Sequence, residues 1–238
     1  MKKQGDLLRA ASELEQALAL SKGTTTDLDW YLDILQSLAF VVSLAGQHER
    51  STACCEEIIE LTGPCGESLH RANALMASGL DAWRRGDPVR AVELQRFGLE
   101  IKLGLDDQLG TAVGLEALAW GVGALGQHKR AAHLLGAAAV VWESSGASIA
   151  TVFPELVGEH DKSVAAARAA LGDQAYAAAF RRGRQMPLAE ALDAAGHTRR
   201  STRSGQVDAG GAGSLTSREE EVAGLLAQGL SNKAIAKS

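Results

Sequence analysis

A short motif recurs along this chain with a nearly constant period. Four stretches begin at Gly5, Gly46, Gly86 and Gly126, and each reads glycine, Asp or Gln, two variable residues, arginine and a small residue. The glycines follow one another at intervals of 41, 40 and 40 residues. A fixed period in this range is typical of stacked supersecondary units, so the repeat constrains the fold more than any other feature.

Each repeat is predicted to be a pair of helices with the glycine between them. Glycine often ends a helix because it adopts the left-handed conformation without steric cost. After Gly86, Asp87 can cap the next helix, and Pro88 suits its first turn. The first helices are expected at about 28–45, 67–85 and 107–125, and the second at about 6–20, 47–62, 87–103 and 127–144. The expected turn residues are Gly46, Arg50, Gly86, Arg90, Gly126 and Arg130.

These pairs predict an all-α protein, and the scarcity of β-branched runs agrees with that class. The repeats resemble tetratricopeptide repeats lengthened to a period of about 40 residues, without that family's tryptophan, glycine and tyrosine signature. The resemblance implies an α-α solenoid over residues 1–196, and further helices are expected at 160–171, 173–184 and from Pro187 to about 195. The helix at 6–20 has no partner before it. This predicts either a chain that begins within a longer solenoid or a short capping helix.

The composition changes sharply at residues 197–214. This stretch, HTRRSTRSGQVDAGGAGS, is rich in Gly and Ser and nearly free of apolar side chains, so we expect a flexible linker. Arg199, Arg200 and Arg203 could contact a phosphate backbone, although a solvated linker is the alternative.

Two short capped helices are predicted after this linker, at residues 215–238. Thr216 and Glu219 form a capping box, and Gly229 ends the first helix. Val222, Leu225 and Leu226 give that helix an apolar stripe, and Ser231 caps the second helix. The pattern is typical of the first half of a helix-turn-helix.

The stretch resembles the LuxR-type helix-turn-helix, and the upstream segments 131–149 and 165–195 resemble those of large multidomain LuxR-type regulators. The framework residues that match are Leu215, Thr216, Arg218, Glu219, Glu221, Val222, Leu225, Leu226, Gly229, Ile235 and Ala236. The resemblance implies phosphate contacts by Ser231, Asn232 and Lys233. In that family the next helix reads the bases, and here the sequence ends at Ser238. We therefore expect a truncated domain that cannot read bases as it stands.

Several classes of protein do not fit the sequence. The net charge is −5, which is unusual for a dedicated nucleic-acid binder. No apolar stretch reaches the ~18 residues of a membrane span, and an odd count of three cysteines favours a reducing cytoplasm. The stretch from Gly121 to Gly126 spells G-x-G-x-x-G but follows no predicted strand, so no nucleotide site is expected. We expect no enzyme, no metal and no cofactor.

The other reactive and aromatic residues are expected to be structural. His48 and His128 are predicted to be exposed at equivalent repeat positions, and Cys54 and Cys55 to pack as small apolar groups. The four tryptophans are expected between helices, with a ligand-facing tryptophan on the concave surface as the alternative. They are Trp30, Trp83, Trp120 and Trp142.

The sequence thus predicts part of a LuxR-family transcriptional regulator. Its repeat region would bind an effector or a protein partner on the concave surface, and its C-terminus would start a domain that binds DNA in the intact parent. The alternative is a stand-alone tetratricopeptide-like module for protein–protein interaction.

Overall fold

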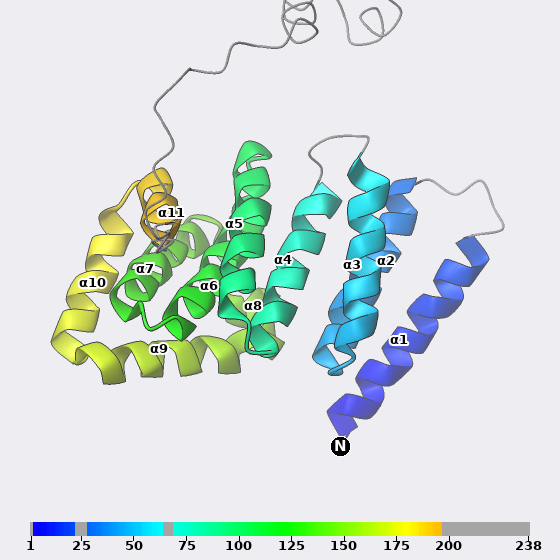
Figure 1. Cartoon of the computed structure of the whole chain (residues 1–238), viewed down its shortest axis with the longest axis horizontal. Coiled ribbons are helices and arrows are strands. Elements are labelled where there is room, and N and C mark those ends of the chain that lie inside the picture. The colour runs from blue at the N-terminus through cyan, green and yellow to red at the C-terminus, as the bar shows by residue number, and fades with distance from the viewer. Residues whose placement is uncertain (1, 22–27, 64–68, 197–238) are drawn as a thin grey trace, which may run out of the picture. The chain divides into compact units, whose positions relative to one another are not determined.

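A computed structural model describes residues 2–21, 28–63 and 69–196 of the chain (Figure 1). Within these residues the structure contains helices and no strand, which confirms the all-α class. The helices are α1 (Lys2–Ser21), α2 (Leu28–Leu44), α3 (His48–Thr62), α4 (Leu69–Arg84), α5 (Pro88–Gly104), α6 (Gln108–Ala124), α7 (His128–Ser144), α8 (Ile149–Val152), the 3-10 helix η2 (Pro154–Leu156), α9 (Val157–Leu171), α10 (Asp173–Gln185) and α11 (Leu188–Gly196).

Each helix from α1 to α7 packs on the next one along the chain. In addition, α2 contacts α4 and α4 contacts α6, so every second helix forms a continuous row. The three glycines Gly46, Gly86 and Gly126 lie in the turns before α3, α5 and α7, with φ angles of 79°, 81° and 76°. Only glycine adopts this left-handed conformation freely, which explains why the same residue recurs at these turns.

Gly5 differs from the other repeat glycines, because α1 runs continuously through it. The helix was expected to begin at residue 6, but residues 2–4 are themselves helical. Gly5 therefore lies within a helix. It matches the later repeat glycines in sequence but does not form a turn.

The turn between α5 and α6 uses an aspartate where the other repeat turns use glycine. Asp106 has a φ of 55° and precedes the capping residue Asp107, as Gly86 precedes Asp87. A side chain in this region costs roughly 1–2 kcal/mol. We therefore expect Asp106→Gly to stabilise the fold by about 0.5–1 kcal/mol, measured by urea unfolding. Gly86→Asp, the reverse exchange at the equivalent turn, should destabilise it.

Two glycines bring α4 and α5 close together. A Cβ on Gly98 would lie 2.6 Å from Met76 Cγ and 2.9 Å from the Ala72 carbonyl oxygen. A Cβ on Gly79 would lie 2.9 Å from Gln95 Nε2. The close approach fixes Met76 and Gln95 at the α4–α5 contact, and both side chains also line a pocket.

The chain departs from the repeat after α7. Ser148 and Thr151 form a capping box that begins the short α8, and Phe153–Pro154 leads into η2. Then α9 begins at Val157, three residues before its expected start, and runs across α6 and α7, which it contacts (Figure 1). This irregular segment was not expected from the sequence.

The packing of α10 on α7 depends on two glycines, one on each helix. Each glycine lies against the backbone of the other helix. A Cβ on Gly136 would lie 2.1 Å from the Phe180 carbonyl oxygen, and one on Gly183 would lie 2.0 Å from the His133 carbonyl oxygen. No side chain fits at either position. At one edge of this contact, the Arg184 guanidinium donates two hydrogen bonds to the Glu143 carboxylate, at 2.6 Å and 2.8 Å.

A buried ion pair joins α6 to α9. His160 Nδ1 lies 2.8 Å from Glu116 Oε2, and the Glu116 side chain is 4% exposed. The hydrogen bond to Glu116 raises the pKa of His160 above its ordinary value of 6.5, although burial acts in the opposite direction. The folded protein therefore favours protonated His160.

This pair predicts a pH dependence of stability. A raised folded-state pKa contributes stability that is fully present below pH 6.5 and is lost as the pH rises through that pKa. We expect this pair's contribution to the free energy of unfolding to fall as the pH rises above 6.5, and His160→Asn to remove this part of the slope. Burial lowers the pKa of His133, which has the opposite effect. The difference between wild type and variant, followed by urea titrations, is therefore the decisive measurement; equal slopes would contradict the prediction.

Candidate ligand pocket between alternate helices

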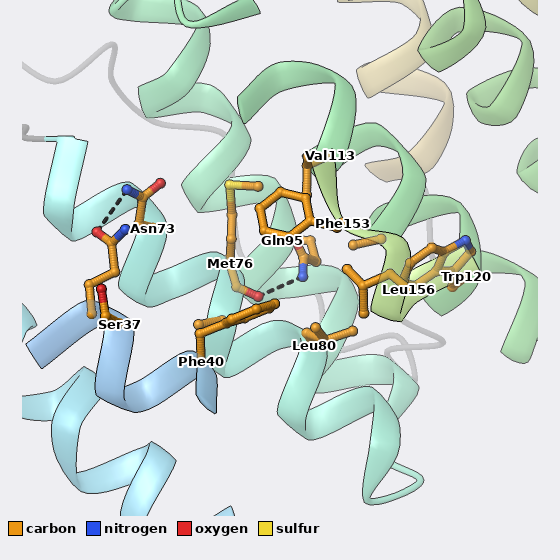
Figure 2. A pocket seen from close by; sticks show the side chains of 13 residues that line it. Ser37, Phe40, Asn73, Met76, Leu80, Gln95, Val113, Trp120, Phe153 and Leu156 are labelled. Atoms are coloured by element: carbon orange, nitrogen blue, oxygen red, sulfur yellow. Dashed lines mark hydrogen bonds between the residues drawn. The ribbon is translucent and has the colours of Figure 1, made fainter. Parts of the chain in front are cut away.

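A cavity of about 310 Å³ lies along the row formed by α2, α4 and α6 (Figure 2). Phe40 comes from α2, Met76 and Leu80 from α4, and Trp120 from α6. The remaining lining residues are Gln36, Ser37, Asn73, Ala77, Gln95, Val113, Ala117, Phe153 and Leu156. Most of the pocket is therefore formed by the packing of the repeats, because α2, α4 and α6 each contribute one row of side chains to it.

Aromatic rings form two walls of the pocket. Phe40 meets Phe153 edge to face, with ring centroids 5.5 Å apart and an interplanar angle of 62°. Trp120 packs against Trp83 with centroids 5.6 Å apart. Edge-to-face and tilted arrangements of this kind are favourable because the positive ring edge meets a negative ring face. The Phe40–Phe153 contact also ties α2 to the irregular segment after α8.

The polar groups of the pocket are amides, one hydroxyl and the indole N–H of Trp120. Asn73 Nδ2 donates a hydrogen bond of 2.8 Å to Gln36 Oε1, beside Ser37 at the α2–α4 end of the pocket (Figure 2). None of the side chains that line the pocket carries a formal charge. A mainly apolar surface with a few fixed polar groups is typical of small-molecule sites.

Gln95 and Trp120 each leave one buried polar atom without a partner among the residues that the structure describes. Gln95 is 1% exposed, and its Nε2 donates a hydrogen bond of 2.8 Å to the Met76 carbonyl oxygen. Within the described ranges, its Oε1 accepts no hydrogen bond and Trp120 Nε1 donates none. Such atoms are costly to bury unless a water or a ligand atom completes their hydrogen bonds.

A second hollow, of about 650 Å³, lies among α6, α7, α9 and α10. Most of its charged groups already have charged partners, although Arg181 also lines it. Glu116 pairs with His160, Glu143 pairs with Arg184, and Arg168 pairs with Asp173 while its guanidinium lies 4.8 Å from the Tyr176 ring centroid. This hollow therefore has the character of a structural network, and the first pocket is the better candidate for a ligand site.

The chain is similar to three mycobacterial proteins. It is 32% identical over 168 residues to the "Putative HTH-type transcriptional regulator Rv0890c" of Mycobacterium tuberculosis, and equally so to MT0914 of a second strain and Mb0914c of Mycobacterium bovis, which carry the same description. The matched stretch covers 71% of this chain and 18% of each relative. Neither a family model nor a solved structure matches the chain.

The residues expected to contact DNA lie outside the described part of the chain. These are Ser231, Asn232 and Lys233. The expected helix-turn-helix framework also lies outside it, namely Leu215, Thr216, Arg218, Glu219, Glu221, Val222, Leu225, Leu226, Gly229, Ile235 and Ala236. The linker at 197–214 lies outside it as well. These assignments stay predictions.

None of the repeat-turn residues lines the pocket. Arg90 forms an ion pair of 3.1 Å with Glu93, and Arg130 donates a hydrogen bond of 2.6 Å to Gln127. Arg50 donates to Gln47 and pairs with Glu15 of α1. These arginines support the helix ends and the α1–α3 contact.

Two expectations about single residues were wrong. His48 and His128 are half-buried instead of exposed, because they begin helices that pack on their neighbours. His48 Nδ1 contacts the carboxylate of Asp81, which is 1% exposed. Trp30 is 48% exposed in the first turn of α2, whereas the three other tryptophans pack between helices as expected.

The structure also bears on the candidate nucleotide, metal and membrane-spanning features. Gly121 of the G-x-G-x-x-G stretch lies within α6, where a Cβ would approach Val92 Cγ2 to 3.0 Å. Across the ranges that the structure describes, no three His, Cys, Asp or Glu side chains converge as metal ligands. Over those same ranges, no helix is both long and apolar enough to cross a bilayer.

Of the residues that line the pocket, only Trp120 was named from the sequence, as one of four tryptophans that could face a ligand. Phe153 and Leu156 belong to the irregular segment, and Gln95 lies in a helix that otherwise reads as ordinary repeat. Two signals could have drawn attention to Phe153. Aromatic residues make up only 4% of the chain, and this one directly precedes a proline, which disfavours helix at the position before it.

Proposed function

We propose that the chain is the sensor region of a LuxR-type transcriptional regulator, together with the beginning of its DNA-binding domain. The similarity to three proteins named as HTH-type transcriptional regulators is the observation that carries this proposal. It extends over 168 residues, which is 71% of the chain, and therefore includes most of the repeat region at residues 1–196. The same names support a protein that is not an enzyme and that acts in the cytoplasm.

The repeat region is the sensor in this proposal. The sequential packing of α1 to α7 and the row of α2, α4 and α6 support a tetratricopeptide-like solenoid. The pocket along that row supports effector binding, because alternate helices from three repeats converge on it. A ligand held there would contact helices from several repeats at once and could bias their spacing.

The C-terminal segment is proposed to touch DNA only through phosphates. Within residues 215–238 the positive charges of Arg218, Lys233 and Lys237 are balanced by three consecutive glutamates from Glu219. Sequence is read by side chains that reach base edges in the grooves, and the resemblance places that task on a helix beyond Ser238. Residues 215–238 by themselves should therefore bind DNA weakly and without sequence preference.

A mobility-shift assay against a pool of random duplexes tests this claim. We expect no DNA sequence to be enriched at about 150 mM salt. Any weak binding of DNA at low salt should decrease in the Lys233→Ala variant. Lys162→Ala, which removes an exposed lysine from α9, is the matched control and should leave that binding unchanged. Enrichment of one sequence would contradict the claim that residues 215–238 contact DNA only through phosphates.

The coding DNA beyond Ser238 tests the regulator itself. A recognition-helix pattern of the form (Ser/Thr)-x-x-Thr-Val-x-x-His in any reading frame is the expected result. Its absence would favour a stand-alone module for protein–protein interaction over a regulator.

A further inference from the structure

We propose that the pocket between α2, α4 and α6 binds a small, uncharged, mostly apolar molecule that carries one N–H or O–H donor. The inference rests on the proposed sensor role and adds to it the chemical class of the effector. Three properties of the pocket lead to this class: its size, the chemistry of its walls and the free acceptor of Gln95.

The size of the pocket limits the ligand to a few rings. Its volume of about 310 Å³ is about twice that of an engineered cavity of roughly 150 Å³ that binds benzene. One or two fused rings with a short substituent would fill it. A long chain or a multi-ring compound would extend out of the pocket, which is partly open, and would leave part of its apolar surface in water.

The walls select against charge. Phe40, Phe153, Trp120 and Leu80 supply ring faces, ring edges and aliphatic surface, and no lining side chain is charged. An ionised group in such surroundings would lose its hydration without gaining a counter-charge. Flat apolar rings, in contrast, keep favourable contacts with both aromatic walls.

The Gln95 amide provides the polar anchor. Because Nε2 donates to the Met76 carbonyl oxygen, rotation of the amide by half a turn would place two oxygens against each other. The orientation is therefore fixed, and Oε1 remains a buried acceptor without a partner among the described residues. A ligand donor would satisfy it, whereas a ligand without a donor would leave it unpaired.

Calorimetric titration of the whole chain with three probes of nearly equal shape tests the proposal. Indole carries an N–H donor, benzofuran replaces that group with an oxygen, and indole-5-carboxylate adds a charge. We expect indole to bind with one-to-one stoichiometry and a submillimolar dissociation constant. Benzofuran should bind about 5-fold more weakly for want of the hydrogen bond, and the carboxylate at least about 10-fold more weakly.

Two substitutions on α4 assign the binding to this pocket. Ala77→Phe places a ring in the cavity and should abolish indole binding. Leu75→Phe introduces the same ring two residues away, at a half-buried position outside the lining, and should retain binding. A third substitution, Gln95→Leu, removes the acceptor and should make indole and benzofuran bind equally.

Circular dichroism of each variant verifies that the helices are intact. The comparison of the three probes on the unaltered chain does not depend on any variant.

The proposal is overturned if indole does not bind, if the carboxylate binds as well as indole, or if Ala77→Phe binds normally. Equal affinities of indole and benzofuran for the unaltered chain would overturn the role of Gln95. These measurements use no DNA. Failure here would leave the regulator proposal standing, and a failure of the regulator proposal in the coding DNA would not alter the binding result.

Discussion

Gly183→Ala is expected to release α10 from α7 and to destabilise the fold by at least about 3 kcal/mol. The added Cβ would lie 2.0 Å from the His133 carbonyl oxygen and 2.7 Å from its Cα. A flexible side chain could move aside, but here the obstacle is the backbone of α7. The helices would have to separate, which would expose the cluster of Tyr176, Ala179 and Ala132. Urea unfolding followed by circular dichroism measures the loss.

Gly136→Ala and Gly158→Ala complete this experiment. Gly136 faces the Phe180 carbonyl oxygen at 2.1 Å from the other side of the contact, so its substitution should cost a similar amount. Gly158 also lies in a helix, but a Cβ there meets nothing within 4 Å. Gly158→Ala should be neutral or stabilise by up to about 1 kcal/mol, because alanine has the higher helix propensity. A loss below about 1 kcal/mol in Gly183→Ala would show that α10 does not pack as described.

Asp107→Ala is expected to have the second large effect, a loss of about 3–5 kcal/mol. Asp107 Oδ2 lies 2.6 Å from Lys102 Nζ, and the Lys102 side chain is only 3% exposed. Asp107 also caps α6 by accepting a hydrogen bond of 2.8 Å from the Gly110 backbone N–H. The substitution would therefore leave a buried ammonium group without its counter-charge and α6 without its cap.

Asp87→Ala separates these two contributions. Asp87 caps α5 in the same way, with a hydrogen bond of 3.0 Å from the Arg90 backbone N–H, but it is exposed and has no buried lysine beside it. Its substitution should cost about 1 kcal/mol, which is the value of a lost cap. Adding Lys102→Met to Asp107→Ala should recover most of the larger loss, since no buried charge remains. Equal losses in the two single variants would contradict the role of the ion pair.

The contribution of Asp107 also has a defined pH range. Burial raises the pKa of Asp107, but the hydrogen bonds from Lys102 and from the Gly110 N–H outweigh it, so the pKa lies below its ordinary value of 3.8. A lowered pKa contributes stability that is present above pH 3.8 and is lost as the pH falls through the folded-state pKa. The difference between wild type and Asp107→Ala should therefore shrink in strong acid.

Helices α2 to α7 could be predicted from the sequence to within a few residues. Their ends depend on local chemistry: a glycine at positive φ before α3, α5 and α7, and aspartate caps at Asp87 and Asp107. Local rules act over a few residues, so one sequence is enough to apply them. The turn at Asp106 shows where such rules fail, since an aspartate there adopts a conformation that the pattern reserves for glycine.

The pocket could be predicted only in outline. An amphipathic repeat indicates that alternate helices share a face, but it does not indicate which side chains leave a gap. Phe153 reaches Phe40 because α8 and η2 turn the chain back. No repeat in the sequence predicts this course of the chain. Gln95 becomes a pocket residue because Gly79 and Gly98 bring α4 and α5 together.

The sequence by itself determined the helical class, the positions of most helices and the resemblance to a LuxR-type motif in residues 215–238. Each of these depends on neighbours in the chain, whose spacing can be read directly. Only the tertiary structure decided that α10 docks on α7 through Gly136 and Gly183, and that an uncharged pocket remains between α2, α4 and α6. Both features depend on distances of a few ångströms between segments far apart in the chain, and such distances are set by packing.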